Sequence, residues 1–490
     1  MRGIFVSSVV TVCAAAALTL PFLAIPSAAV PAPPDGASVP TTRAPAGAHG
    51  VPGATQSLPL VPLGPDRRAA HPGGTRAVPR GLPPREVARF SLVGIVWDDA
   101  ATELRGRAQI RTREAGTRTW SAWQDVRTHD DRPDPGPPEA RRGRPRGATA
   151  PLWVGASDAV QVRVRPEGGR ASGALPPGLR VELVDPGRDP APVRQAPKPA
   201  PSPSDEETAS SAANYPLAPL GATEIPALAR PESEKDIDAA RVDLTGATDA
   251  RPPADGRGEA DPENEGSEAP AETADDTDNE EDDADPWSHY VGSRPRIVTR
   301  AGWGADESIR ERGFAYTTTV RAAFVHHTAS GNGYSCAQSA SLVRGIYRYH
   351  VVSSGWRDIG YNFLIDKCGK IYEGRAGGVA KPVRGAHTLG FNANSMGIAV
   401  LGSFEESNPP NAVVNALAGL TAWKLGLYDV NPLGTARLVS GGGNLFKKGT
   451  TVRLKVISGH RDGYATECPG DRLYKRLGAI RTAAARLQGR

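Results

Sequence analysis

Residues 320–350 read VRAAFVHHTASGNGYSCAQSASLVRGIYRYH, an apolar run that ends in two histidines and is followed by a helical pattern. The run 320–325 has the length and composition of a buried strand, which would carry His326 and His327 at its end. The phrase SCAQ has the Ser-x-x-Gln form of a capping box, and apolar residues recur behind it at helical intervals. A strand followed by a helix in this way is typical of an α/β or α+β domain.

The same alternation continues downstream to the end of the chain. The patterns predict a hairpin of strands 362–366 and 371–373, a strand over 396–404, a helix over about 409–425 and a last strand over 452–457. Residues 431–448 contain a run of three glycines and are predicted to be a flexible insertion.

The last strand leads to His460, and Cys468 follows eight residues later, directly before Pro469. Proline favours the first position of a helix, and a thiol at a helix start would be stabilised as a thiolate. Two imidazoles and one thiolate suit Zn²⁺ and leave a fourth position open for water. The spacing alone does not decide whether His326 or His327 is the first ligand.

Five phrases together resemble the peptidoglycan recognition protein and amidase-2 family: VHHTAS, GWRDIGYNFLID, IYEGRAGG, GAHTLGFNANSMGIAVLGSF and SGHRDGYATECPG. The resemblance covers about residues 294–487. It implies a central mixed β-sheet flanked by helices. It also implies a zinc cleft that hydrolyses the amide between N-acetylmuramic acid and L-alanine in peptidoglycan.

Carried over by position, the resemblance assigns the zinc ligands to His326, His460 and Cys468, which selects the first histidine of the pair. A spare His327 would support a neighbour or pack in the core.

The resemblance also assigns roles around the metal. Tyr361 matches the family's catalytic tyrosine, and His387 matches its substrate-groove histidine, with a surface loop residue as the alternative. The chain departs from phage-type members at Thr466, where they carry lysine. A threonine hydroxyl can still donate a hydrogen bond, so we expect it to take part in catalysis.

The chain has four cysteines, and Cys13 lies in the amino-terminal apolar segment. If that segment is removed, an odd number remains, which one pair and one metal thiolate would explain. Cys336 and Cys368 are the disulfide candidates, and two buried free thiols are the alternative.

Residues 1–29 have the features of a secretory signal peptide: Arg2, an apolar stretch and a small-x-small site at 27–29. A membrane anchor is the alternative, because the apolar run approaches the length of a spanning helix. Residues 30–86 are rich in Pro, Ala and Gly, and are predicted to be disordered.

Residues 87–187 are predicted to form an accessory β-rich, sandwich-like domain from alternating runs at 90–97, 104–113, 160–165 and 179–184. Its phrases FSLVGIVW, WSAW and PLWVG resemble the β-rich module found ahead of amidase domains in actinobacterial exported proteins. Its tryptophans would form either a sugar-stacking platform or part of the core: Trp97, Trp120, Trp123 and Trp153.

Residues 188–293 become strongly acidic and are predicted to be a disordered linker between this domain and a catalytic domain over 294–490. Calcium binding is the alternative, but no EF-hand spacing is present. The formal net charge of +4 averages this acidic stretch with basic flanks and does not indicate nucleic acid.

Together these features predict a secreted, cell-wall-associated zinc amidase that acts on peptidoglycan as a monomer, without stable membrane insertion. The alternatives are a catalytically silent peptidoglycan-binding protein and an adhesion or immune-modulating surface protein that uses the same cleft.

Overall fold

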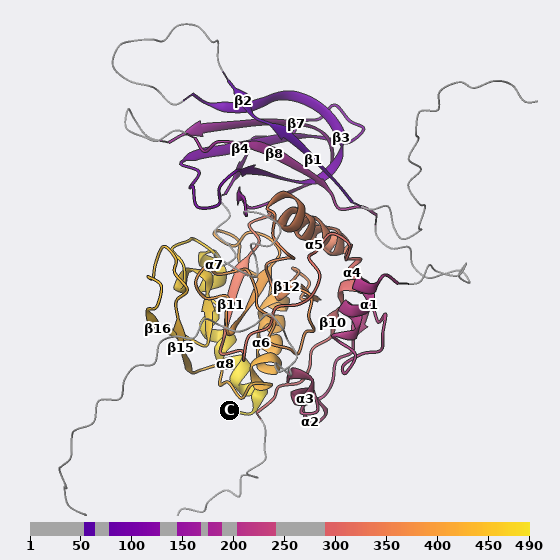
Figure 1. Ribbon diagram of the computed structural model, residues 1–490, viewed down its shortest axis with the longest axis vertical. Helices are drawn as coiled ribbons and strands as arrows, with labels where there is room; N and C mark the ends of the chain where they lie inside the picture. The colour runs from indigo at the N-terminus through magenta and orange to yellow at the C-terminus, as the bar shows by residue number, and fades with distance from the viewer. Residues whose placement is uncertain (1–52, 64–77, 128–144, 168–174, 189–202, 242–289) are drawn as a thin grey trace, which may run out of the picture. The chain divides into compact units, whose positions relative to one another are not determined.

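The structure is a computed structural model that describes residues 53–63, 78–127, 145–167, 175–188, 203–241 and 290–490. The predicted signal peptide and the acidic run 275–283 lie outside these residues. Figure 1 shows two folded parts, a β-rich domain and a domain in which helices surround a sheet.

The carboxy-terminal domain is built on a seven-stranded mixed sheet in the order β17-β11-β14-β12-β13-β10-β9. Strand β11 pairs in parallel with both β14 and β17, whereas β12 and β13 form the predicted antiparallel hairpin. The strands are β9 (Glu224–Ile225), β10 (Ile297–Val298), β11 (Ala322–His327), β12 (Phe363–Ile365), β13 (Ile371–Glu373), β14 (Ser395–Val400) and β17 (Ile457–Gly459).

Side chains from the sheet alternate between two hydrophobic clusters, one on each face. On β12, Phe363 and Ile365 join a cluster with α6 and α8, whereas Leu364 joins a cluster with α5. This is the period-two alternation of a pleated strand. The helices are α4 (Arg300–Trp303), α5 (Ser339–Arg348), α6 (Asn411–Gly426), α7 (Asp471–Tyr474) and α8 (Leu477–Gln488). The predicted sheet flanked by helices is therefore confirmed.

The capping box predicted before α5 is present, because the backbone N–H of Ser335 donates to Oε1 of Gln338 at 2.8 Å. The helix enters through a 3₁₀ turn (Cys336–Gln338) and leaves through a π-helical turn (Tyr349–Ser353).

The insertion predicted as flexible over 431–448 is partly regular. Strands β15 (Thr435–Val439) and β16 (Thr451–Lys455) form an antiparallel ribbon, and Ala436 and Leu438 pack into the main core. Alternating burial along β15 explains why this glycine-flanked segment holds a strand.

The prediction of a disordered linker over 188–293 is wrong for residues 203–241. These residues form α1 (Asp205–Ala212), β9, α2 (Arg230–Ser233) and α3 (Asp236–Ala240). They are held by contacts distant in sequence: the amide of Asn214 donates to Glu373 at 2.8 Å, and Asp236 pairs with Arg294 at 2.8 Å. Such partners supply the packing that local composition does not reveal.

The β-rich domain contains β1 (Ala54–Pro59), β2 (Val61–Pro62), β3 (Arg80–Trp97), β4 (Gly106–Glu114), β5 (Gln124–Val126), β6 (Gly147–Ala148), β7 (Leu152–Pro166) and β8 (Arg180–Asp185). The main strand order in its sheet is β1-β8-β3-β7-β4-β5. Register shifts in the pairing of β3 with β7 bend the long strand β3. Strands β1, β2 and the start of β3 lie within the stretch 30–86 predicted as disordered. They are ordered because each pairs with a neighbouring strand.

The four tryptophans of this domain divide into two pairs. Trp97 and Trp153 are buried in hydrophobic clusters. Trp120 and Trp123 are half-buried and stack with guanidinium groups, and Arg163 lies 4.0 Å from the ring centroid of Trp123. The core interpretation therefore holds for the first pair.

The π-helical turn after α5 contacts the β-rich domain. The hydroxyl of Tyr349 donates to the carbonyl of Thr149 at 3.0 Å, and Gly94 leaves room for this ring, because an added Cβ would lie 2.3 Å from the hydroxyl oxygen. Ser353 donates to the buried carboxylate of Glu182 at 3.1 Å. Across the described residues, no helix combines the length and apolar character needed to cross a membrane.

Candidate metal centre

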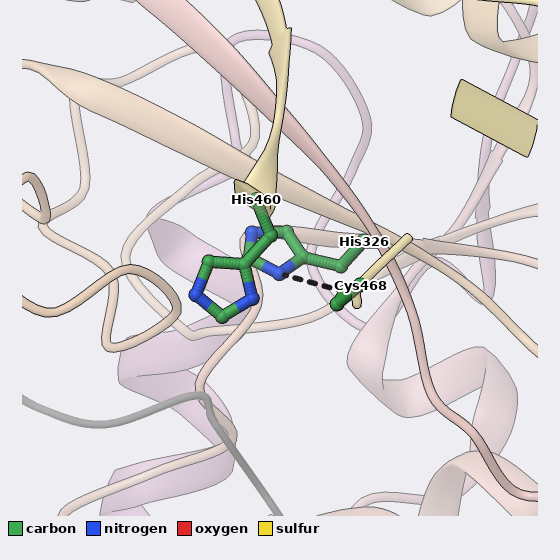
Figure 2. A group of neighbouring side chains, drawn as sticks. All are labelled: His326, His460 and Cys468. Atoms are coloured by element: carbon green, nitrogen blue, oxygen red, sulfur yellow. Dashed lines mark hydrogen bonds between the residues drawn. The ribbon is translucent and has the colours of Figure 1, made fainter. Parts of the chain in front are cut away.

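Three side chains with metal-binding atoms come together where β11 and β17 end: His326, His460 and Cys468 (Figure 2). The parallel register pairs Val325 with Gly459, so the next residue on each strand is a histidine at the same edge of the sheet. Cys468 comes from the loop before α7. All three residues are buried, and their ligand atoms lie within 4.8 Å of one another.

The donor set fits zinc. Sγ of Cys468 lies 3.8 Å from Nδ1 of His326, and the rings of His326 and His460 have centroids 4.5 Å apart. Tetrahedral zinc with ordinary bond lengths places its ligand atoms about 3.3–3.6 Å from one another. The 3.8 Å pair is close to this spacing, and ligand atoms as far apart as 4.8 Å would have to move closer to bind one ion. Within the described part of the chain, this is the one group of three such residues close enough to hold a metal ion.

His327 is directed away from this cluster, as alternation along a strand requires. Its Nδ1 accepts a hydrogen bond from the backbone N–H of Phe404 at 3.3 Å, and its Nε2 lies 3.5 Å from Glu405. The structure thus brings His326, and not His327, to the other two candidate ligands.

The sulfur of Cys468 was expected to lie at the backbone N–H groups of a helix start, but its backbone donor is elsewhere. Helix α7 begins at Asp471, because Gly470 has φ 86° and ψ 145°, which is not a helical conformation. The prediction that Cys468 lies at the helix start is therefore wrong. Instead, the backbone N–H of His327 donates to Sγ at 3.4 Å, which favours the charged thiolate.

His387 lies behind His326 and is fully buried. Its Nδ1 is 3.3 Å from Nε2 of His326 and 3.0 Å from the hydroxyl of Thr388. The surface-loop alternative is therefore wrong. Its predicted contact with substrate stays a prediction. Its geometry is that of a partner that fixes the ring of His326, so that Nδ1 faces Cys468.

Tyr361 lies beside the cluster, with its ring centroid 5.6 Å from that of His326. His350, which packs on Trp356 with centroids 4.3 Å apart, lies on Tyr361 at 5.6 Å. His350 is fully buried, so it packs in the core beside Tyr361.

Thr466 is half-buried, and its hydroxyl oxygen accepts the backbone N–H of Cys468 at 3.1 Å. The residue therefore shapes the loop that presents the thiol.

The predicted disulfide between Cys336 and Cys368 is present, with Cα atoms 6.3 Å apart. Among the described residues, Cys468 is the cysteine outside a disulfide. The pairing thus leaves one thiol for metal binding.

Glu405 is the residue near the centre that the sequence did not indicate. It follows β14, and its carboxylate lies between His327 and Arg127 of the β-rich domain. An acidic residue after a strand is too common to be selected without knowledge of its neighbours.

The fold and the cluster together define an α/β domain with a mixed sheet and a His, His, Cys centre at the strand ends. Comparison with known families gives two matches. Residues 316–471 match the family described as N-acetylmuramoyl-L-alanine amidase (Amidase_2), and residues 40–205 match the Rv3811 N-terminal galactose-binding domain-like family.

Individual relatives agree with the first match. Peptidoglycan-recognition protein SC2 of Drosophila simulans is 30% identical over 181 residues, which are 37% of this chain and 84% of that protein. Peptidoglycan-recognition protein SC1a/b of the same species is 30% identical over 195 residues, 39% of this chain and 88% of that protein. Among solved structures, wild-type Drosophila PGRP-LB is 26% identical with a TM-score of 0.30, covering 37% of this chain and 92% of that one. The chain belongs to the peptidoglycan recognition protein and amidase-2 family.

Proposed function

We propose that the protein is a secreted, zinc-dependent N-acetylmuramoyl-L-alanine amidase that hydrolyses the bond between N-acetylmuramic acid and L-alanine in peptidoglycan. The observation that carries this proposal is the approach of two imidazoles and one thiol, all buried, to within 4.8 Å. The family membership supports it, since the matched family is described as an amidase and the relatives are named for peptidoglycan recognition.

His326, His460 and Cys468 would hold zinc and leave one coordination position for the reaction. Zinc, when bound, supplies Lewis acidity and lowers the pKa of water toward about 7, which makes amide hydrolysis feasible near neutral pH. The buried surroundings strengthen electrostatic interactions at the centre.

Tyr361 would donate a hydrogen bond to the oxygen that gains charge as the amide is attacked. Removal of one such donor from a preorganised site costs roughly 10²-fold in rate or more. Thr466, through its contact with the backbone of Cys468, would hold the loop that carries the third ligand and could direct its hydroxyl hydrogen toward the same oxygen.

The test is the identity of the released product. Purified sacculi are incubated with the wild-type protein and with Cys468→Ser, with and without a chelator, and released peptides are analysed for a free amino-terminal L-alanine. We expect release by the wild type alone, lost on chelation and restored by zinc. Tyr361→Phe should keep zinc and lose about 10²-fold in rate. If the zinc-loaded wild type binds sacculi but releases no such peptide, the amidase proposal fails. The alternative of a catalytically silent peptidoglycan-binding protein would then be favoured.

Secretion forms part of the proposal and is tested separately. We expect the protein in the culture medium to begin near residue 30, after the small-x-small site. A protein that retains residues 1–29 and sediments with membranes would point to an anchor.

A further inference from the structure

The β-rich domain contacts the loops that follow β11 and β14, of which β11 carries the candidate ligand His326. The backbone N–H of Trp153 donates to the carbonyl of Ser330, in the loop after β11, at 3.0 Å. Nη1 of Arg127 lies 2.9 Å from Oε1 of Glu405, in the loop after β14. The domain therefore contacts the rim of the centre as well as the π-helical turn.

The two loops are also tied to each other. Gly402 donates its backbone N–H to the hydroxyl of Thr328 at 3.0 Å, and Gly331 donates to the hydroxyl of Ser403 at 3.1 Å. A displacement of one loop would consequently be transmitted to the other. The carbonyl of Arg127 accepts a hydrogen bond from Ala150 at 2.7 Å, which fixes the backbone from which the guanidinium extends.

A chain of contacts connects Arg127 to the thiol. The carboxylate of Glu405 lies 3.5 Å from Nε2 of His327, whose Nδ1 accepts from Phe404. Since Nδ1 accepts, a neutral ring carries its proton on Nε2, the ring atom nearest the carboxylate, and the contact is a close approach rather than a hydrogen bond. The backbone N–H of the same His327 donates to Sγ of Cys468.

The exposed fraction of the side chain decreases along this series of contacts, from Arg127 through Glu405 to His327. The side chain of Arg127 is 51% exposed, that of Glu405 is 20% exposed and that of His327 is 5% exposed. The exposed pair alone would contribute little, whereas the inner contacts lie where solvent screens them less.

We propose that Arg127 and Glu405 are positioning residues for the metal centre: the β-rich domain holds Glu405, Glu405 orients His327, and His327 keeps its backbone N–H directed at the thiolate of Cys468. The accessory domain would then be a structural part of the centre, in addition to any ligand of its own. This inference rests on the proposed zinc site and not on hydrolysis.

Zinc affinity of the full-length protein, measured by competition with a chromophoric chelator, tests the proposal. Glu405→Ala should weaken zinc binding about 10-fold, the low end of the range for groups that support metal ligands. Arg127→Gln should weaken it roughly 3-fold, as expected for a partly exposed ion pair, and Arg127→Lys should restore most of the loss. Arg107→Gln is the matched control, because it breaks an exposed pair with Asp125 inside the same domain, and should have no effect.

Two further measurements separate positioning from general damage. Thermal unfolding of the metal-free proteins should be similar for Arg127→Gln and Arg107→Gln. The double variant Arg127→Gln/Glu405→Ala should lose no more zinc affinity than Glu405→Ala alone, because both substitutions interrupt the same series of contacts. Cobalt-substituted protein should show a changed thiolate charge-transfer band in Glu405→Ala.

The outcomes distinguish the two proposals. Wild type that binds zinc with the same affinity as both variants would overturn this inference and leave the amidase proposal intact. Wild type that binds zinc more tightly than the variants but hydrolyses nothing would overturn the amidase proposal alone. Wild type that binds no zinc would overturn both.

Discussion

The backbone N–H of His327 donates to the sulfur of Cys468 at 3.4 Å, so the histidine whose ring is directed away from the metal cluster still contacts it. Its neighbour His326 presents Nδ1 to the same sulfur at 3.8 Å. Adjacent residues of one strand therefore approach the thiol in different ways, one by its side chain and one by its backbone.

This arrangement predicts different results for the two histidines. His326→Ala removes a proposed ligand and should abolish stoichiometric zinc binding. His327→Ala keeps the backbone donor and should retain one zinc per chain, with an affinity about 10-fold lower. Elemental analysis after dialysis against a weak chelator measures both. Loss of zinc in His327→Ala alone would reverse the assignment.

The disulfide between Cys336 and Cys368 should stabilise the carboxy-terminal domain. The two residues are 32 apart in sequence, and closing a loop of this size restricts the unfolded chain by about 3–4 kcal/mol in the chain-entropy description. Replacing both cysteines by serine should lower the free energy of unfolding by roughly that amount. Chemical denaturation checks this, and an unchanged midpoint would show that the bond contributes nothing.

Arg300 is expected to be essential for folding. The side chain is 1% exposed, and it pairs with Glu307 at 2.7 Å and with Asp358 at 3.1 Å. Glu307 has a second partner in Arg310, whereas Asp358 would be left buried without a cation among the described residues. Arg300→Met should cost about 3–5 kcal/mol. Arg107→Gln, at an exposed pair, should cost less than about 1 kcal/mol.

Glu182 makes stability depend on pH. Burial raises the pKa of its carboxyl group, although hydrogen bonds from Ser57 and Ser353 and the charge of Arg180 oppose the shift. A carboxyl whose pKa is raised on folding stabilises the fold fully below its unfolded value, about 4.3, and loses this contribution as pH rises through the folded value.

We therefore expect Glu182→Gln, which remains neutral and can keep both serine contacts, to unfold with a flatter pH dependence above about pH 4.3 than the wild type. Thermal melts across this range measure the difference. Parallel pH curves for the two proteins would mean that Glu182 is not the group responsible.

Much of the fold could be predicted because its patterns are local. The apolar run before His326 predicted β11, and the SCAQ phrase predicted the capping box that precedes α5. The site could be predicted in part, but the last strand predicted over 452–457 is wrong in its bounds. Residues 451–455 form β16, which pairs with β15, and the short β17 leads to His460 and pairs with β11. The choice of His326 over His327 required the family resemblance.

What could not be predicted depends on contacts between distant residues. Residues 203–241 resemble a linker in composition, but Asn214 bonds Glu373, 159 residues away. His387 lies in a phrase typical of a surface loop, yet it is buried against His326, 61 residues earlier. Glu405 has no local feature that marks it, and its position follows only from its neighbours.

His326, His460 and Cys468 are proposed to form a catalytic zinc site. The most direct measurement is a zinc titration of metal-free protein in which bound zinc and the rate of L-alanine-terminated peptide release from a soluble muramoyl peptide are recorded in the same samples. We expect the rate to rise in proportion to bound zinc, to reach its maximum at one zinc per chain, and to stay at background in Cys468→Ser. A rate that is independent of zinc, or one zinc per chain with no peptide released, would contradict the proposal.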